Sequence, residues 1–275
     1  MTSIALPVLA ALFAWWFATG AILYLDSLPR STYRHSMVSA SLLALPALLG
    51  LALTSHSATP AGAYLAFLCA LVIWAWQEMA FLMGFLTGPR KHACAPDCRG
   101  WRHFAHGVHA ILHHELALLA GGVLVFALTW DGVNQVGAWT YLTLWVMRQS
   151  AKLNLFLGVR NLGESLLPDH LHYLKGYFRR RAMNPLLPIS VIGSGGLAVV
   201  LAWMALAPGV QPFQTTAHLL LATLLGLAAL EHLFLVLPVP LDALWQWGAK
   251  SRPRDEATDL AAPCHAAVAV VKVEP

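Results

Sequence analysis

The dominant pattern of the chain is a series of long apolar stretches separated by short polar connectors. A helix that crosses a bilayer needs about 20 predominantly apolar residues. Seven stretches meet this length, at residues 3–25, 37–56, 61–87, 103–129, 134–157, 186–207 and 213–237. The connectors 57–62, 130–134 and 207–212 contain Pro or Gly, which predicts tight hairpins. The pattern therefore predicts an all-α fold, a polytopic membrane bundle of seven transmembrane helices.

The Lys and Arg residues outside the spans fall only in alternate connectors and in the tail. These residues are Arg30, Arg34, Arg90, Lys91, Arg99, Arg102, Arg160, Lys175, Arg179, Arg180, Arg181, Lys250, Arg252, Arg254 and Lys272. Cytoplasmic loops of membrane proteins carry such an excess of Lys and Arg. The sequence therefore predicts a periplasmic N-terminus and a cytoplasmic C-terminus. We expect one domain over residues 1–248 and a disordered cytoplasmic tail over 249–275, which is polar and contains Pro.

The composition agrees with a membrane protein and excludes several other classes. Of the 275 residues, 58% are hydrophobic and only 11% are charged, whereas soluble domains carry roughly 25% charged residues. Because the charges are so few, the net charge of +4 indicates contacts with lipid head groups rather than with nucleic acid. We therefore expect a multi-pass membrane protein.

The connector between the fifth and sixth stretches has an amphipathic pattern. Leu167, Leu171, Leu174 and Phe178 can share one helical face, with Lys and Arg residues opposite. This pattern predicts a short interfacial helix that lies on the cytoplasmic membrane surface.

Ionisable residues inside membrane spans are costly, and each is a candidate for a functional role. With the predicted orientation all of them except His218 fall in the cytoplasmic half of their spans, which favours one polar site open to the cytoplasm. The candidates for ligand binding are Glu78, His106, His109, His113, His114, Arg148, Lys152, Glu231 and His232. The candidates for a metal site are Glu78, His109, His113, Glu115, Glu231 and His232.

The histidine-rich run His103–Glu115 holds five imidazoles. At about 100° per residue, His106, His109 and His113 fall on one stripe, which we expect to face the bundle. Glu115 points to a different face.

Three chemistries remain open for these residues. The first is a dinuclear metal site, although Glu-x-x-His motifs and repeated histidine boxes are missing from the sequence. The second is a tetrapyrrole or quinone site with a histidine ligand. In the third, Glu78 and Glu231 neutralise Arg148 and Lys152, and the histidines only hydrogen-bond neighbouring helices. The residues alone favour the third.

A cysteine pair lies in the connector between the third and fourth stretches. The segment "HACAPDC" places His92, Cys94 and Cys98 in a polar loop. A C-x3-C spacing without a second pair is a weak zinc signal, and the sequence favours an ordinary polar loop over a zinc site.

Several long motifs resemble one family. They are "WWFATGAILYLDSLPR" (15–30), "WQEMAFLMGFLTGPR" (76–90), "ILHHE" (111–115), "NQVGAWTYLTLWVMRQSAKLNLFLGVRN" (134–161) and "LPDHLHYLKGYFRRRAMNPLLP" (167–188). Together they resemble the PuhE family, photosynthetic complex assembly proteins of anoxygenic phototrophic bacteria. The resemblance covers about residues 14–247 and implies a multi-pass protein of the bacterial inner membrane, either cytoplasmic or intracytoplasmic.

The resemblance implies a role in photosynthesis, through assembly of the reaction centre and light-harvesting complex and control of bacteriochlorophyll supply. The implied partners are reaction-centre and light-harvesting subunits, other assembly factors and membrane lipid. It carries no catalytic residues across. We therefore expect a pigment-handling or assembly factor rather than an enzyme, with bacteriochlorophyll or a precursor as ligand. The alternatives are a membrane redox enzyme with a di-iron or haem site, and an interaction scaffold without a ligand.

Overall fold

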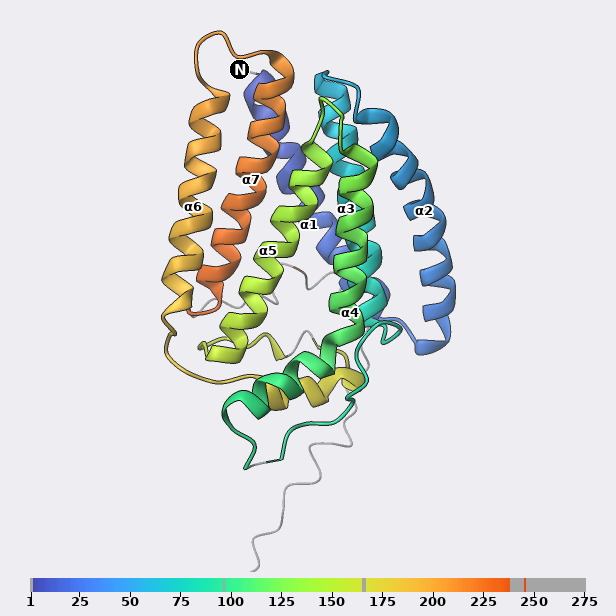
Figure 1. The fold of residues 1–275 in the computed structure, drawn as a ribbon, viewed down its shortest axis with the longest axis vertical. Helices are drawn as coiled ribbons and strands as arrows, with labels where there is room; N and C mark the ends of the chain where they lie inside the picture. Colours follow the sequence, from blue (N-terminus) through green and yellow to red (C-terminus); the bar gives the residue numbers. More distant parts are fainter. Residues whose placement is uncertain (1, 96, 165–166, 238–244, 246–275) are drawn as a thin grey trace, which may run out of the picture.

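The fold is a bundle of long helices, seen in a computed structural model that describes residues 2–95, 97–164, 167–237 and 245. Figure 1 shows the helices running up and down in alternation. The predicted tail, 249–275, lies outside the described residues. In chain order the elements are α1 (Thr2–Ser27), η1 (Arg30–Thr32), α2 (Tyr33–Thr54), α3 (Pro60–Leu82), α4 (Gly100–Thr129), α5 (Val136–Leu157), η3 (Asp169–Tyr177), α6 (Leu186–Ala205) and α7 (Pro212–Phe234).

Six of these helices are long and apolar enough to cross a membrane, namely α1, α2 extended by η1, α3, α4, α6 and α7. The remaining predicted stretch, 134–157, also forms a helix, α5, but it lies outside this group. Its C-terminal half is polar and carries Arg148, Gln149, Ser150, Lys152 and Asn154. These side chains contact neighbouring helices, because polar groups within a bundle need partners there.

The main core joins α2, α3, α4, α5 and α7. Leu51, Phe67, Leu118, Tyr141 and Leu220 are almost fully buried in it. The outer faces of α2 and α6 are apolar and exposed, with Leu42, Leu45 and Leu49 on α2 and Ile192 and Val199 on α6. Exposed apolar rows of this kind suit contact with lipid.

The two ends of the bundle differ in their connections. At one end, the α2–α3 and α4–α5 hairpins lie against each other, since the Asn134 backbone N–H donates to the Ser55 carbonyl at 2.8 Å. The other end carries the α3–α4 and α5–α6 connections, with their Arg and Lys residues, and we call it the basic end. The N-terminus lies at the hairpin end (Figure 1).

The third predicted stretch, 61–87, is shorter as a helix than expected, because α3 ends at Leu82. The chain turns at Gly84, whose φ of +83° suits glycine. Thr87 and Gly88 then lie against α4, where the His114 backbone N–H donates to the Thr87 carbonyl at 3.0 Å. Gly88 lies against the α4 backbone so closely that a Cβ at this position would collide with the His109 carbonyl oxygen.

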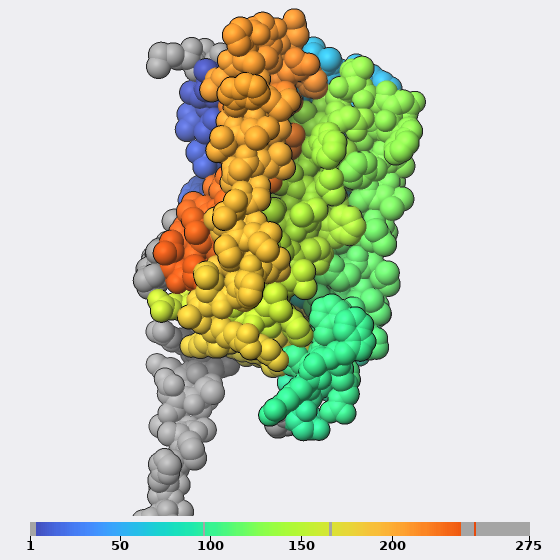
Figure 2. Space-filling model, turned by 60° about the vertical axis from the view of Figure 1, so that its left-hand side comes forward, coloured from blue at the N-terminus to red at the C-terminus, as the bar shows by residue number. Residues whose placement is uncertain are grey.

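The predicted interfacial helix is present in position but differs in type and in contacts. It is the 3-10 helix η3, and its apolar residues Leu171, Leu174 and Tyr177 are buried against Phe81 and Ala110. The prediction that its apolar face lies on the membrane surface is therefore wrong for these residues, because that face packs on the bundle. Figure 2 shows the segment beside the first turns of α4 at the basic end.

Candidate functional site

A cavity of about 600 Å³ lies between α1, α3, α4, α5 and α7 and reaches the basic end at η3. This volume falls within the roughly 300–1,000 Å³ typical of small-molecule sites. Most of its wall is apolar, from residues such as Trp15, Trp74, Phe104 and Phe156. Its charged lining residues are Glu78, Glu115, Arg148, Lys152 and Glu231. An apolar wall with a few convergent charged groups is the usual form of a ligand pocket.

The Glu78 carboxylate on α3 forms an ion pair with Arg148 on α5. Arg148 Nη2 donates to Glu78 Oε2 at 2.7 Å. The Glu78 side chain is buried, whereas that of Arg148 is 39% exposed. The second oxygen of Glu78 and Nε of Arg148 have no hydrogen-bond partner within the described residues. The two charges therefore neutralise each other, and each side chain keeps one polar atom without a hydrogen-bond partner in the described part of the chain.

A second ion pair joins α4 to α5. Lys152 Nζ donates to Glu115 Oε1, and Gln149 Nε2 donates to Glu115 Oε2, each at 2.6 Å. Both charged side chains are about four-fifths buried. Arg148 and Lys152 are four residues apart and share a face of α5, so one helix supplies cations to carboxylates from two others. Pairing is what makes charges at this depth tolerable.

The third carboxylate, Glu231 on α7, has a different environment. Its Oε1 accepts a hydrogen bond from Trp15 Nε1 on α1 at 2.7 Å. The Trp15 ring makes an edge contact with Trp245, at 5.4 Å between centroids. Among the described residues, no Lys or Arg lies within ion-pair distance of Glu231. Unlike Glu78 and Glu115, Glu231 therefore forms no ion pair within the described residues.

The ring of His232 is buried and both of its nitrogens are occupied. Nδ1 donates to the Ala228 carbonyl at 2.8 Å, and Nε2 lies 2.9 Å from Ser150 Oγ. Ser150 also contacts Ser190 of α6 at 2.7 Å. His232 thus links α7, α5 and α6, and it is absent from the pocket wall. Our expectation that it binds a ligand does not fit these contacts.

The ring of His114 is fully buried behind the pocket. It packs on Phe81 with 4.4 Å between ring centroids. Its Nε2 lies 3.8 Å from Glu78 Oε1, and neither ring nitrogen has a hydrogen-bond partner in the described part of the chain. His114 therefore lies next to the Glu78–Arg148 pair, but Phe81 and Glu78 separate it from the cavity.

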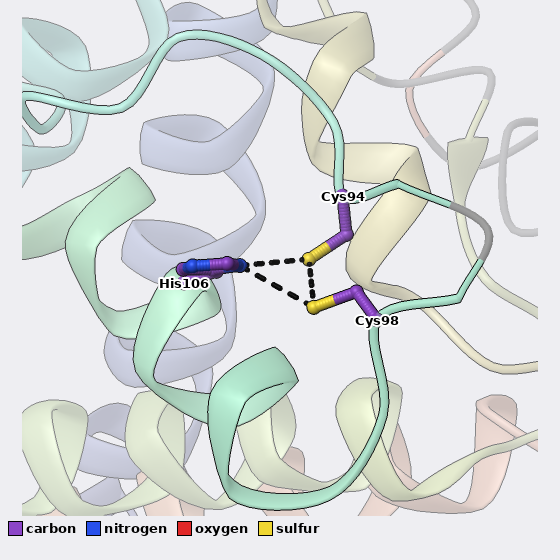
Figure 3. Close-up of side chains that lie close together, drawn as sticks. All are labelled: Cys94, Cys98 and His106. Carbon is purple, nitrogen blue, oxygen red and sulfur yellow. Dashed lines mark hydrogen bonds between the residues drawn. The ribbon is translucent and has the colours of Figure 1, made fainter.

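The predicted histidine stripe is wrong in its orientation. His109 and His113 are exposed, and His106 faces the cysteine loop (Figure 3). The reason is the close approach of 83–88 to α4, which turns the face of Ala110 and His114 inward. Glu115, which was expected to point away from the site, lines the pocket.

The residues proposed for a dinuclear metal do not come together. Glu78 and Glu115 are held by Arg148 and Lys152, and both nitrogens of His232 are engaged. Within the described residues, the one group with metal-ligand geometry is Cys94, Cys98 and His106. The predicted metal set therefore does not form a centre in this structure.

Sequence reasoning missed several polar residues around the pocket. Gln149 completes the Glu115 cluster, and Trp15 holds Glu231. The Tyr141 hydroxyl lies 2.7 Å from both Gln77 Oε1 and the Leu118 carbonyl. Gln77 and Gln149 each adjoin a charged candidate, Glu78 and Arg148, in the sequence. Both amides lie within predicted spans, where a polar side chain needs a partner from a neighbouring helix, and that is the signal that could have identified them.

The long apolar helices and the charges paired between them define a multi-pass membrane-helix protein. Residues 1–256 match the family described as "Protein of unknown function (DUF3623)", and the chain belongs to this family. It is also 37% identical, over 94% of its length and 95% of the relative's, to an "Uncharacterized 30.4 kDa protein in puhA 5'region" of Rhodobacter capsulatus. No solved structure matches the chain.

Proposed function

We propose that this protein is an assembly or pigment-handling factor for the photosynthetic reaction centre and light-harvesting complex. The Rhodobacter capsulatus relative is described by its position in the 5' region of puhA, which points to a photosynthesis gene cluster. The resemblance of five long motifs to the PuhE family supports the same role. The membrane in question is the cytoplasmic or intracytoplasmic membrane of a phototrophic bacterium.

The proposal includes seven spans with the basic end in the cytoplasm. The Arg and Lys residues at that end support this orientation. The span added to the six apolar helices is α5, whose 22 residues extend about 33 Å at 1.5 Å per residue. Its polar half is paired with Glu78, Glu115 and Ser190 rather than with lipid, which makes a spanning position for α5 tolerable. The pocket would then open toward the cytoplasm.

The pocket is proposed to hold bacteriochlorophyll or a precursor. The observation that carries this is the set of charged groups facing one apolar cavity of about 600 Å³. A macrocycle needs apolar walls for its ring and a hydrogen-bond donor for a polar substituent. Arg148, whose side chain is 39% exposed, can donate such a bond while it stays paired with Glu78. No histidine belongs to the wall that the described residues form, so the role of facing the central metal falls to Glu231.

The absorption spectrum of the protein tests this proposal. The chain is purified in mild detergent from a phototrophic host, and its pigment is extracted and counted per chain. We expect a Soret or far-red band at about one pigment per chain. Glu231→Gln should lower that ratio, whereas His113→Gln, at an exposed position of α4, should leave it unchanged. A colourless protein that still co-purifies with reaction-centre subunits would leave the scaffold role in place of the pigment role.

A further inference from the structure

Cys94, Cys98 and His106 bring three metal-binding atoms together at the basic end. Cys94 Sγ lies 2.8 Å from Cys98 Sγ, and His106 Nδ1 lies 3.1 Å from the first sulfur and 3.3 Å from the second. The two cysteines belong to the α3–α4 connection and the histidine to the second turn of α4, and all three point to a common centre (Figure 3). From these contacts we infer that the three residues form a zinc-binding site.

The donor set and its spacing suit zinc. Two thiolates and an imidazole are ligands that Zn²⁺ prefers, with bonds of about 2.3 Å to sulfur and 2.0–2.1 Å to nitrogen. In a tetrahedron with those bond lengths the ligand atoms lie roughly 3.4–3.8 Å apart. Each pair here is closer than that by less than about 1 Å, a gap that small rotations of the cysteine side chains provide. The site takes three protein ligands, and water completes the tetrahedron.

The local fold holds the cysteine loop in place without a metal. Arg90 Nε donates to the Tyr177 hydroxyl at 2.7 Å, and that hydroxyl donates to the His92 carbonyl at 2.9 Å. Ala93 packs against Gly176, where a Cβ would come within 2.8 Å of the Ala93 side chain. The loop is thus fixed to η3 next to its first cysteine. Such supporting contacts orient ligands in metal sites.

The pair is better suited to ligation than to thiol redox chemistry. Both cysteines are free thiols, and their sulfurs are farther apart than the roughly 2.05 Å of a disulfide. The imidazole of His106 lies within 3.3 Å of both sulfurs and supplies a third donor, which a metal site needs and a disulfide does not.

A metal here would act on the pocket through Tyr177. This residue lines the cavity and its hydroxyl binds the loop that carries both cysteines. Zinc would therefore join the α3–α4 connection to α4, and through Tyr177 it would steady η3, which covers the basic end of the pocket. The zinc site stands on its own geometry and does not depend on the pigment proposal.

Metal analysis of the full chain in detergent tests the site. The protein is purified under reducing conditions, stripped with a chelator and titrated with Zn²⁺, and Co²⁺ serves as a spectroscopic substitute. We expect one Zn²⁺ per chain and a thiolate-to-cobalt charge-transfer band. Cys94→Ser and His106→Ala should each weaken binding by more than the roughly 10–100-fold that loss of a supporting group costs.

Matched variants distinguish loss of the metal site from loss of any other thiol or histidine and from misfolding. Cys69→Ser removes a thiol from α3, and His109→Ala removes the histidine one turn beyond His106; both should keep full binding. Cys98→His should retain cobalt binding with a weaker charge-transfer band, which shows that the site and not only the fold is intact. The inference is overturned if the stripped wild-type chain takes up no more metal than the Cys94→Ser variant. It is also overturned if protein from native membranes carries a Cys94–Cys98 disulfide.

Discussion

Glu78 on α3 and Arg148 on α5 form an ion pair of 2.7 Å at the wall of an apolar cavity. The carboxylate is buried, whereas the guanidinium is partly open to the cavity. Loss of the Arg148 cation would therefore leave a buried and uncompensated carboxylate.

Arg148→Met should destabilise the protein by leaving the buried Glu78 carboxylate without its cation. Breaking a fully buried pair costs about 3–5 kcal/mol, and we expect less here because Arg148 reaches the cavity. The double variant Glu78→Gln with Arg148→Met should recover most of the loss, since it removes both charges. Thermal unfolding in detergent measures both effects. Equal melting temperatures for the single and double variants would contradict the pairing.

Gly88→Ala should loosen the contact between segment 83–88 and α4. A Cβ at position 88 collides with backbone atoms of His109 and Ala110, and backbone cannot move aside as a side chain can. Gly196→Ala is the matched control, because a Cβ there meets nothing within 4 Å and alanine suits a helix better by roughly 0.5–1 kcal/mol. We expect a lower melting temperature for Gly88→Ala and an unchanged or higher one for the control. The reverse order would show that the close approach does not limit packing.

Reporter fusions should place the two ends of α5 on opposite sides of the membrane. Alkaline phosphatase joined after Asp131, in the α4–α5 turn, should be active, because that turn is proposed to be periplasmic. The same enzyme joined after Lys175, in η3, should be inactive. A fluorescent protein that folds only in the cytoplasm should give the complementary result at both sites. Activity on the same side for both fusions would mean that α5 does not cross.

His109→Ala combined with His113→Ala should leave pigment content and phototrophic growth unchanged, because both side chains are exposed on α4. Glu115→Gln should lower pigment content, since Glu115 lines the pocket and is held by Lys152 and Gln149. The pigment extracted per cell, compared at equal protein levels in the membrane, measures the difference. If the histidine variant lost pigment and Glu115→Gln kept it, the site would lie on the outer face of α4 instead.

Much of the bundle could be predicted from the sequence, because long apolar runs and their polar connectors are local properties. All seven predicted stretches form helices, and four of the predicted pocket residues, Glu78, Arg148, Lys152 and Glu231, line one cavity. Helix ends were less predictable. The helix α3 stops at Leu82 and the chain folds back at Gly84, although the apolar character of the segment continues.

The sequence did not predict which face of α4 turns inward, and it did not predict that the cysteine loop meets His106. Periodicity groups His106, His109 and His113 on one stripe, but it does not say which face of the helix turns inward. That choice depends on Gly88 approaching the α4 backbone at Ala110 from another segment. In the same way, Cys94 and Cys98 meet His106 rather than His92 only because the loop folds onto α4.

By itself, the sequence determined the membrane class, the helices and the residue types available for a site, since each of these follows from local composition and spacing. The tertiary structure alone decided which carboxylate pairs with which cation, which histidines are buried and which atoms converge. The physical reason is that burial and pairing depend on contacts between segments far apart in the chain, such as Glu78 with Arg148 and Trp15 with Glu231.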